Sequence, residues 1–193
     1  MKPPPPFARQ MALAEPDITC TGTRLVYENR WMRVREDAVV RRDGSPGIYG
    51  VIEKQHFVTI VPLHADGTLT LVEQFRYPVG ERGLEFPQGM WGPPGTPPLA
   101  AARHELLEET GLTAGSWTEI AFLHAAPGTM NQGYTLFLAT DLTEGTAQLE
   151  TEEQDLIARR IPRDALEAMI RAGEIRDSIT LAAFGMLRAR GLL

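Results

Sequence analysis

The stretch Gly89–Leu112 reads GMWGPPGTPPLAAARHELLEETGL, and the interpretation of the whole chain depends on it. A loop rich in glycine and proline leads into a short predicted helix that carries Glu105, Glu108 and Glu109 and ends at Gly111. Spacings of three and four place the three carboxylates on one helix face. Such clusters suit Mg²⁺ or Mn²⁺, hard cations that also bind phosphate oxygens. The stretch therefore predicts a divalent-metal site, and a solvated acidic helix face is the alternative.

The composition is that of a globular protein with a substantial core. The chain has 193 residues, of which 43% are hydrophobic and 23% charged, and this length favours one main domain. A formal net charge of −6 argues against nucleic acid as a partner, because binding to the phosphate backbone requires a basic surface. The single cysteine, Cys20, fits a reducing compartment, and no apolar run is long enough to span a membrane. We therefore expect a cytoplasmic protein.

The N-terminal part predicts a small antiparallel sheet. Residues 1–22 begin with a proline run and are expected to be a poorly ordered lead-in. From Thr23 onward, apolar and charged residues alternate in two segments, 23–29 and 31–41, and 47–54 has the pattern of a returning strand. We therefore predict an arginine-rich β subdomain over residues 23–55.

Residues 56–193 are predicted to form the main domain, with an α+β fold. The segments 57–63 and 69–75 flank Asp66-Gly67, a strong signal for a β-hairpin. Strands, one helix, further strands and two final helices follow one another, which indicates a mixed sheet between helices, an α/β/α sandwich. The later strands are expected at 116–125, at 134–140 and through 161–162, and the final helices at 164–172 and 178–190.

The segment Glu105–Leu112 resembles the second half of the signature of the Nudix hydrolase family, GX5EX7REUXEEXGU, at every specified position. The resemblance implies a mixed sheet between helices and cleavage of a nucleoside diphosphate linked to another group. It also implies that Glu105, Glu108 and Glu109 bind Mg²⁺ or Mn²⁺, and that Glu108 and Glu109 take part in catalysis.

Three departures affect the first half of the signature. His104 stands where the family has arginine, Thr96 stands where it has glutamate, and the gap after Gly89 is one residue longer. At a spacing of four residues, His104 can reach Glu108. Thr96 before two prolines predicts a helix start with Thr96 as the cap. These departures leave open a catalytically weak or inactive nucleotide-sensing module. A further alternative is an RNA-cap or oligophosphate hydrolase, but such an enzyme is expected to have a more basic groove than a chain with a net charge of −6 provides.

Other segments resemble the ADP-ribose pyrophosphatase-like group of the same family. They are 72–79, 84–89, 126–129 and 173–180. The resemblance implies ADP-ribose or a related nucleotide sugar as substrate. It also implies that Gln88 offers its backbone carbonyl to the metal, and that Arg76 and Glu85 lie at the ribose-phosphate end of the substrate. A surface ion pair is the alternative for Arg76.

Two further predictions follow from this group. Its mobile loop with a catalytic glutamate corresponds to residues 150–155, where Glu152 and Glu153 are the candidates and a solvated loop is the alternative. Its N-terminal strands cross to a partner subunit, which implies a homodimer. Tyr27 and Trp31 are then candidates for stacking on the nucleobase.

Overall fold

A computed structural model describes residues 16–90, 92–149 and 154–193, which fall into two compact units. The first unit contains the chain up to Lys54 together with Gly128–Asn131. The second contains 55–127 and 132–193. The boundary after Lys54 agrees with the expected end of the β subdomain, but the contribution of 128–131 was not predicted.

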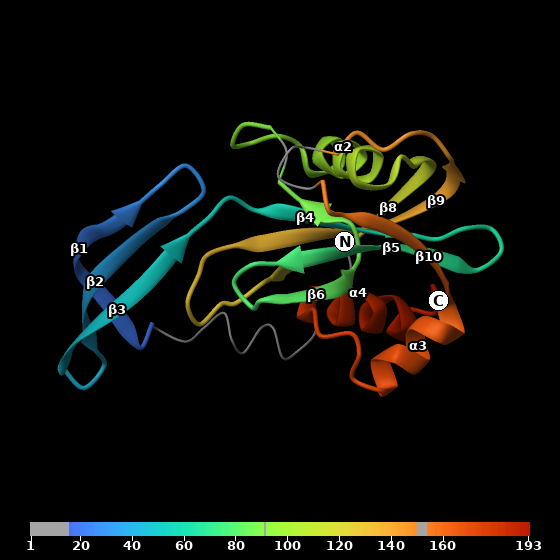
Figure 1. The fold of residues 1–193 in the computed structure, drawn as a ribbon. Helices are drawn as coiled ribbons and strands as arrows, with labels where there is room; N and C mark the ends of the chain where they lie inside the picture. Colours follow the sequence, from blue (N-terminus) through green and yellow to red (C-terminus); the bar gives the residue numbers. More distant parts are fainter. Residues whose placement is uncertain (1–15, 91, 150–153) are drawn as a thin grey trace, which may run out of the picture. The chain divides into compact units, whose positions relative to one another are not determined.

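The first unit is a three-stranded antiparallel sheet in the order β1-β2-β3 (Figure 1). Its strands are β1 (Ile18–Glu28), β2 (Arg33–Arg41) and β3 (Pro46–Glu53). The lead-in prediction was wrong for residues 18–22, because β2 is long enough to pair with them, Ile18 opposite Arg41. Residues 1–15 lie outside the described part. The inserted loop is held by β3, since the Ile52 N–H donates to the Thr129 carbonyl at 2.9 Å.

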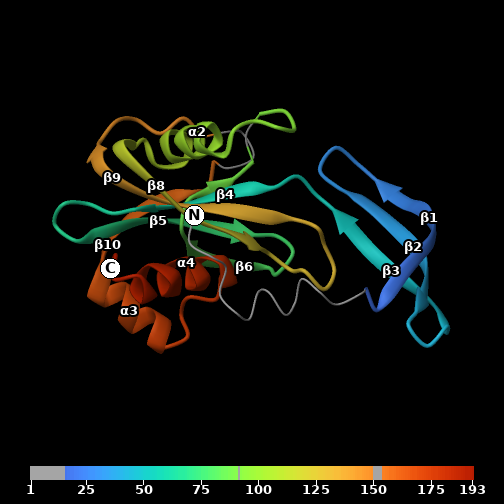
Figure 2. The same cartoon turned by 180° about the vertical axis from the view of Figure 1, so that it is seen from behind.

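The second unit is an α/β/α sandwich, as predicted. Helix α2 lies on one side of the strands, and α3 and α4 lie on the other (Figures 1 and 2). One sheet has the order β7-β4-β9-β8, with β4 and β9 parallel, and the other has the order β10-β5-β6. The elements are β4 (Phe57–Pro62), β5 (Thr68–Arg76), β6 (Glu81–Glu85), β7 (Gln88–Gly89), α2 (Pro98–Thr110), β8 (Thr113–His124), β9 (Gly133–Thr143), β10 (Ile157–Pro162), α3 (Arg163–Arg171) and α4 (Ser178–Ala189).

The predicted hairpin of the second unit is present only at its turn. His64 N–H donates to the Thr68 carbonyl, and Gly67 adopts the expected positive φ of 81°. Beyond the single bridge between Leu63 and Leu69, the two strands separate into different sheets. The prediction of a paired hairpin was therefore wrong. Strand β4 is hydrogen-bonded through its backbone to β7 and β9, whereas β5 is hydrogen-bonded to β6 and β10.

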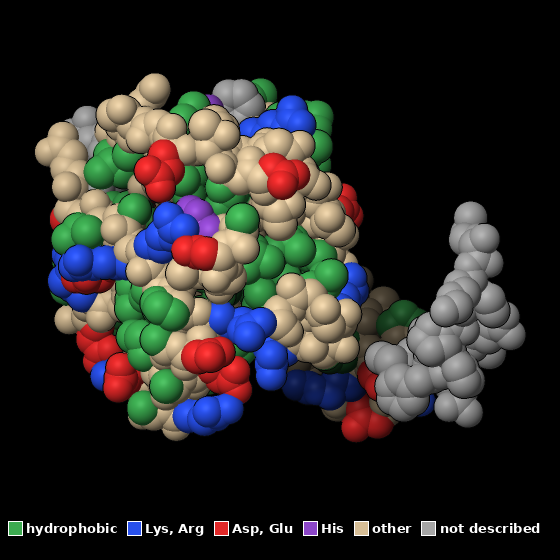
Figure 3. All heavy atoms as spheres, turned by 90° about the vertical axis from the view of Figure 1, so that its right-hand side faces the viewer, with side chains coloured by type: hydrophobic (Ala, Val, Ile, Leu, Met, Phe, Trp, Pro, Cys, Tyr) green, Lys and Arg blue, Asp and Glu red, His purple; other side chains and the backbone are tan. Residues whose placement is uncertain are grey.

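Alternation along β9 places a core on each face of its sheet. Leu136 and Leu138 join a buried cluster with the final helices, including Phe184 and Leu187. Phe137 on the opposite face joins a second cluster in which α2 packs against β4. No helix within the described residues is long and apolar enough to cross a membrane. On the face shown in Figure 3, basic and acidic side chains are interspersed in small groups.

Candidate functional site

Helix α2 fixes the position of the predicted metal-binding carboxylates. Pro98 occupies its first turn, and Gly111 ends it with a φ of 73° while its N–H donates to the Leu107 carbonyl at 2.8 Å. The apolar face of α2 packs on β4 through side chains that include Leu106. This packing turns the carboxylates of Glu105, Glu108 and Glu109 inward, where they are only 5%, 7% and 2% exposed. The alternative of a solvated acidic helix face is therefore wrong.

Thr96 does not cap this helix. The cap position is Pro97, whose ring has no hydrogen-bond acceptor, and the Thr96 hydroxyl donates to the Pro93 carbonyl at 2.8 Å. Two consecutive prolines shift the start of the helix by one residue, because Pro97 has an extended ψ of 130°. The prediction of a threonine cap was wrong, although the prediction of a proline in the first turn was right.

Buried carboxylates require partners, since desolvation of an unpaired charge is costly. The Gln88 backbone N–H donates to Glu109 Oε2 at 3.1 Å. His104 Nδ1 lies 2.9 Å from Glu108 Oε2, so the predicted proximity of these two side chains is confirmed. Glu105 lies directly against the backbone of Gly89, where an added Cβ would fall 2.4 Å from Glu105 Oε2. Strand β7 thus contacts Glu105 and Glu109, whereas Glu108 contacts His104 on its own helix.

A second group of side chains continues this network toward β5. Arg76 Nε donates to Glu85 Oε1 at 3.0 Å, and Arg76 Nη2 donates to Glu85 Oε2 at 2.5 Å. The amide Nε2 of Gln88 donates to the same Glu85 carboxylate at 2.7 Å. Glu85 is 5% exposed, whereas the Arg76 side chain is 41% exposed. The structure therefore contains an ion pair of Arg76, which was the alternative to a phosphate contact. Gln88 links this pair to Glu109, because its side chain donates to Glu85 and its backbone N–H donates to Glu109.

The surroundings of Arg76 favour the charged form of its guanidinium. Burial alone would lower its pKa, but the hydrogen bonds to Glu85 and the negative charges of Glu85 and Glu109 raise the pKa of Arg76 above its ordinary value. Arg76 is thus a fixed cation close to the acidic face of α2. A fixed guanidinium with an accessible edge is well suited to phosphate oxygens.

The donor set is of the kind that suits a hard divalent cation. The described residues contain no preassembled group of three acidic, histidine or cysteine side chains that could hold a metal ion. Three observations nevertheless fit such a site: three buried carboxylates share one face, Gly89 leaves room for Glu105, and Gln88 Oε1 is buried with no hydrogen-bond partner among the described residues. The sequence analysis proposed the backbone carbonyl of Gln88 as a ligand and did not consider its side-chain oxygen.

The remaining predicted site residues lie either outside the described residues or in the first unit. Glu152 and Glu153 lie outside the described residues. Tyr27 and Trp31 belong to the first unit, where each is 51% exposed and the Arg30 guanidinium lies 4.0 Å from the centroid of the Trp31 ring.

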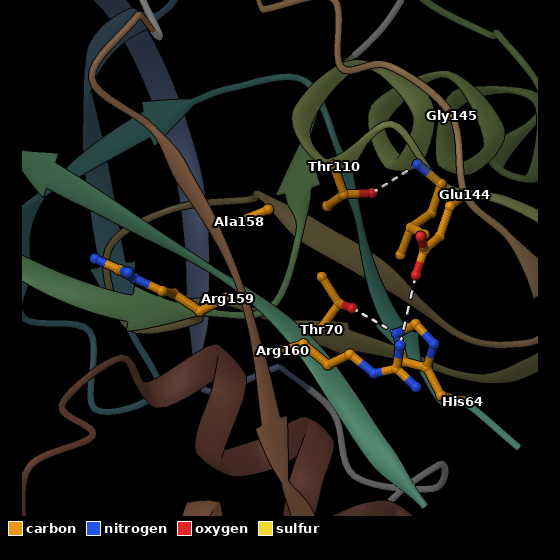
Figure 4. Close-up of a pocket in the computed structure, with 9 residues that line it drawn as sticks. His64, Thr70, Thr110, Glu144, Gly145, Ala158, Arg159 and Arg160 are labelled. Carbon is orange, nitrogen blue, oxygen red and sulfur yellow. Dashed lines mark hydrogen bonds and ion pairs between the residues drawn. The ribbon is translucent and has the colours of Figure 1, made fainter. Parts of the chain in front are cut away.

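A cavity of about 210 Å³ lies at the C-terminal end of α2 (Figure 4). It is bordered by Thr110, by Glu144 and by side chains of the β5–β10 sheet. His64 Nε2 and Thr70 Oγ1 are 2.8 Å apart there, and Arg160 Nη1 lies 3.5 Å from Glu144 Oε1. Burial, followed by the charge of Arg160, lowers the pKa of His64. None of the predicted site residues borders this cavity.

Comparison with known proteins agrees with this architecture. Residues 54–182 match the family model described as the NUDIX domain, and residues 18–52 match the N-terminal domain of nucleoside diphosphate sugar hydrolases. The chain is 31% identical to an ADP-ribose pyrophosphatase of Mycobacterium tuberculosis over 171 residues, 88% of this chain and 83% of the relative. It is 30% identical to a GDP-mannose pyrophosphatase of Citrobacter koseri over 132 residues, 65% of this chain and 69% of the relative.

A solved structure shares the fold. The crystal structure of an ADP compounds hydrolase superposes with a TM-score of 0.79 at 22% identity, and covers 91% of this chain and 95% of its own. The chain belongs to the Nudix family. Within that family it is a pyrophosphatase of the ADP-ribose pyrophosphatase-like group, as the resemblance implied.

Proposed function

We propose that this enzyme hydrolyses the pyrophosphate of a nucleotide sugar in a reaction that depends on Mg²⁺ or Mn²⁺, with ADP-ribose as the leading substrate. Hydrolysis of ADP-ribose yields AMP and ribose 5-phosphate. The buried acidic face of α2, held against β7 through Gln88 and Gly89, is the observation that carries the proposal. The similarity to an ADP-ribose pyrophosphatase over most of both chains supports the choice of substrate.

Each carboxylate of α2 has a proposed role. Glu105, Glu108 and Glu109 hold the metal, with Gln88 as a further oxygen donor. A bound divalent metal neutralises phosphate charge and lowers the pKa of a bound water molecule. Glu108 or Glu109 on the helix, or Glu152 or Glu153 beyond the described residues, accepts the proton of the attacking water. General-base catalysis of this kind contributes about 10²–10⁴-fold to rates.

Arg76 and Glu85 are proposed to act at the ribose-phosphate end of the substrate. Glu85 holds the guanidinium of Arg76 through two of its nitrogen atoms, so the cation loses little further freedom when it meets a phosphate. The exposed part of the Arg76 side chain remains available to an anionic ligand. Glu85 is buried and already accepts hydrogen bonds, so we assign it the role of orienting Arg76.

The first unit is proposed to form the homodimer and to contribute to the base pocket. Every residue of β1 is exposed, and apolar side chains such as Leu25, Val26 and Ile48 are at least 46% exposed. A second copy of the chain would remove this apolar surface from water. Tyr27 and Trp31 offer aromatic faces for a nucleobase. Light scattering after gel filtration is expected to give twice the chain mass, and a monomer would contradict this assignment.

A substrate panel tests the central part of the proposal. ADP-ribose and GDP-mannose are incubated with the purified protein at millimolar Mg²⁺ or Mn²⁺, and the products are separated by chromatography. The expected result is release of AMP and ribose 5-phosphate, abolished by a chelator. Tight binding without turnover of either compound would favour the nucleotide-sensing module instead.

A further inference from the structure

The Thr180 side chain connects helix α4 to the backbone of the candidate site. Thr180 is completely buried in the first turn of α4, and its hydroxyl oxygen accepts a hydrogen bond from the Phe86 N–H at 2.9 Å. The two residues are 94 positions apart in the chain. The hydroxyl also donates to Asp177 Oδ2 at 2.7 Å.

The direction of these hydrogen bonds is fixed. Asp177 is the N-cap of α4, and its carboxylate accepts the Thr180 N–H at 2.8 Å. Because an ionised carboxylate only accepts hydrogen bonds, the hydroxyl proton of Thr180 must point toward Asp177. A lone pair of the hydroxyl is then left facing the Phe86 N–H. In a buried place this arrangement is costly to disturb, because no water replaces the missing partner.

The peptide held in this way lies in the middle of the site network. Glu85, immediately before Phe86, forms the ion pair with Arg76. The carbonyl of Pro87, immediately after it, accepts the Ile60 N–H at 2.9 Å. Gln88 then donates to both Glu85 and Glu109. A shift of the Phe86 backbone would therefore change the geometry at Arg76 and at the carboxylates of α2 together.

We propose that Thr180 is a positioning residue, which holds residues 85–88 in register between the Arg76–Glu85 pair and the carboxylates of α2. The inference rests on the proposed function for its effect on hydrolysis. It assigns a role in the site to α4, an element whose side chains Ala183, Phe184 and Leu187 pack in the core. The competing explanation is that Thr180 only stabilises the fold, and the two explanations differ in measurable ways.

The experiment compares Thr180→Val, which removes the hydroxyl at nearly constant volume, with Thr180→Ser, which restores it. Mutation of residues that hydrogen-bond to metal ligands typically lowers metal affinity or activity by about 10–100-fold. We expect Thr180→Val to weaken Mn²⁺ binding by about tenfold or more, measured by electron paramagnetic resonance on the metal-free protein, and to lower kcat/KM on ADP-ribose correspondingly. Hydrogen exchange of the Phe86 amide is expected to become faster. Thr180→Ser is expected to reverse all three changes.

Thr70→Val is the matched control. Thr70 is also buried, and its hydroxyl lies 2.8 Å from His64 in the cavity of Figure 4, whose lining includes none of residues 85–88. This variant loses a comparable hydrogen bond, so it is expected to lower the denaturation midpoint while Mn²⁺ binding and kcat/KM stay unchanged. If Thr180→Val does not fold, Thr180→Cys replaces it, because a thiol is a weak acceptor of similar size.

Two results would overturn the inference. One is a Thr180→Val protein with accelerated Phe86 exchange but wild-type Mn²⁺ affinity and kcat/KM. The other is a Thr70→Val protein with the same losses, which would show a general effect of stability. Failure of the wild-type protein to hydrolyse any nucleotide would contradict the proposed function alone, because Mn²⁺ binding and amide exchange would still test the role of Thr180.

Discussion

The carboxylate of Glu105 occupies the space that a side chain at position 89 would need. A Cβ on Gly89 would lie 2.4 Å from Glu105 Oε2 and 2.7 Å from its Cδ. A side chain at position 89 would therefore displace the Glu105 carboxylate, and glycine allows this carboxylate to lie against strand β7. The glycine that opens the family signature thus has a physical role, which is to admit one of the carboxylates proposed to bind the metal.

Gly89→Ala is expected to displace Glu105 and reduce activity by about 10–100-fold, the range seen when the support of a metal ligand is disturbed. The rate of ADP-ribose hydrolysis at increasing Mg²⁺ concentrations measures the effect. Gly83→Ala is the control, because a Cβ on Gly83 meets no atom within 4 Å. Equal rates for the Gly89→Ala and wild-type proteins would contradict the assignment of Glu105.

Arg76→Ala is expected to lower both stability and substrate affinity. It leaves the buried Glu85 without its cation, and we expect a loss of about 1–3 kcal/mol, less than for a fully buried pair because Arg76 is 41% exposed. Urea unfolding measures this loss, and KM measures the effect on substrate.

The double variant Arg76→Ala with Glu85→Gln separates the two effects. Removal of both charges is expected to restore much of the stability. KM should nevertheless remain high, because no cation is left for the phosphate. A double variant with wild-type KM would show that Arg76 is an ion pair and nothing more.

His104→Ala is expected to lower kcat by about 10–100-fold, because Glu108 loses a neighbour that lies 2.9 Å from its Oε2. His104→Arg restores the residue of the family signature and is expected to match or exceed the wild-type rate. Steady-state kinetics of the two variants measure both effects. If His104→Ala retains the wild-type kcat, the orientation of Glu108 does not depend on His104.

Asp66 is expected to contribute to stability in a defined acid range. Hydrogen bonds from Thr68, followed by the charge of Arg160, lower the pKa of Asp66 from 3.8 to about 2. Because the folded-state pKa is the lower one, the contribution is complete above pH 3.8 and is lost as the pH falls through about 2. The stability difference between the wild-type and Asp66→Asn proteins, measured by urea unfolding, should therefore shrink across this range. A difference that is independent of pH would contradict the prediction.

Local patterns in the sequence predicted much of the fold. The spacing of the glutamates, together with the glycine at position 111, predicted α2 and its end, and the final two helices were predicted to within a residue or two. These features depend on interactions between residues that are close in the chain, which periodicity and capping describe.

Contacts between distant segments could not be predicted from such patterns. The Asp-Gly turn predicted a hairpin, but the sheet in which β4 lies depends on its parallel pairing with β9. In the same way, no local signal indicates that Thr180 meets Phe86, or that Gly89 meets Glu105. No local pattern indicates that the side-chain oxygen of Gln88 is buried, because its burial depends on the packing of distant segments. For the contact between Gly89 and Glu105, the only indication in the sequence was the glycine that opens the family signature ahead of the acidic helix.

The most direct test of the metal site on α2 is Mn²⁺ binding and ADP-ribose hydrolysis by Glu105→Gln, Glu108→Gln and Glu109→Gln, with the exposed Glu119→Gln as the control for loss of a charge. The predicted result is weaker Mn²⁺ binding in all three variants and a rate lower by at least about 10²-fold for Glu108→Gln and Glu109→Gln, with Glu119→Gln unchanged. Wild-type metal affinity and turnover in all three α2 variants would contradict the account.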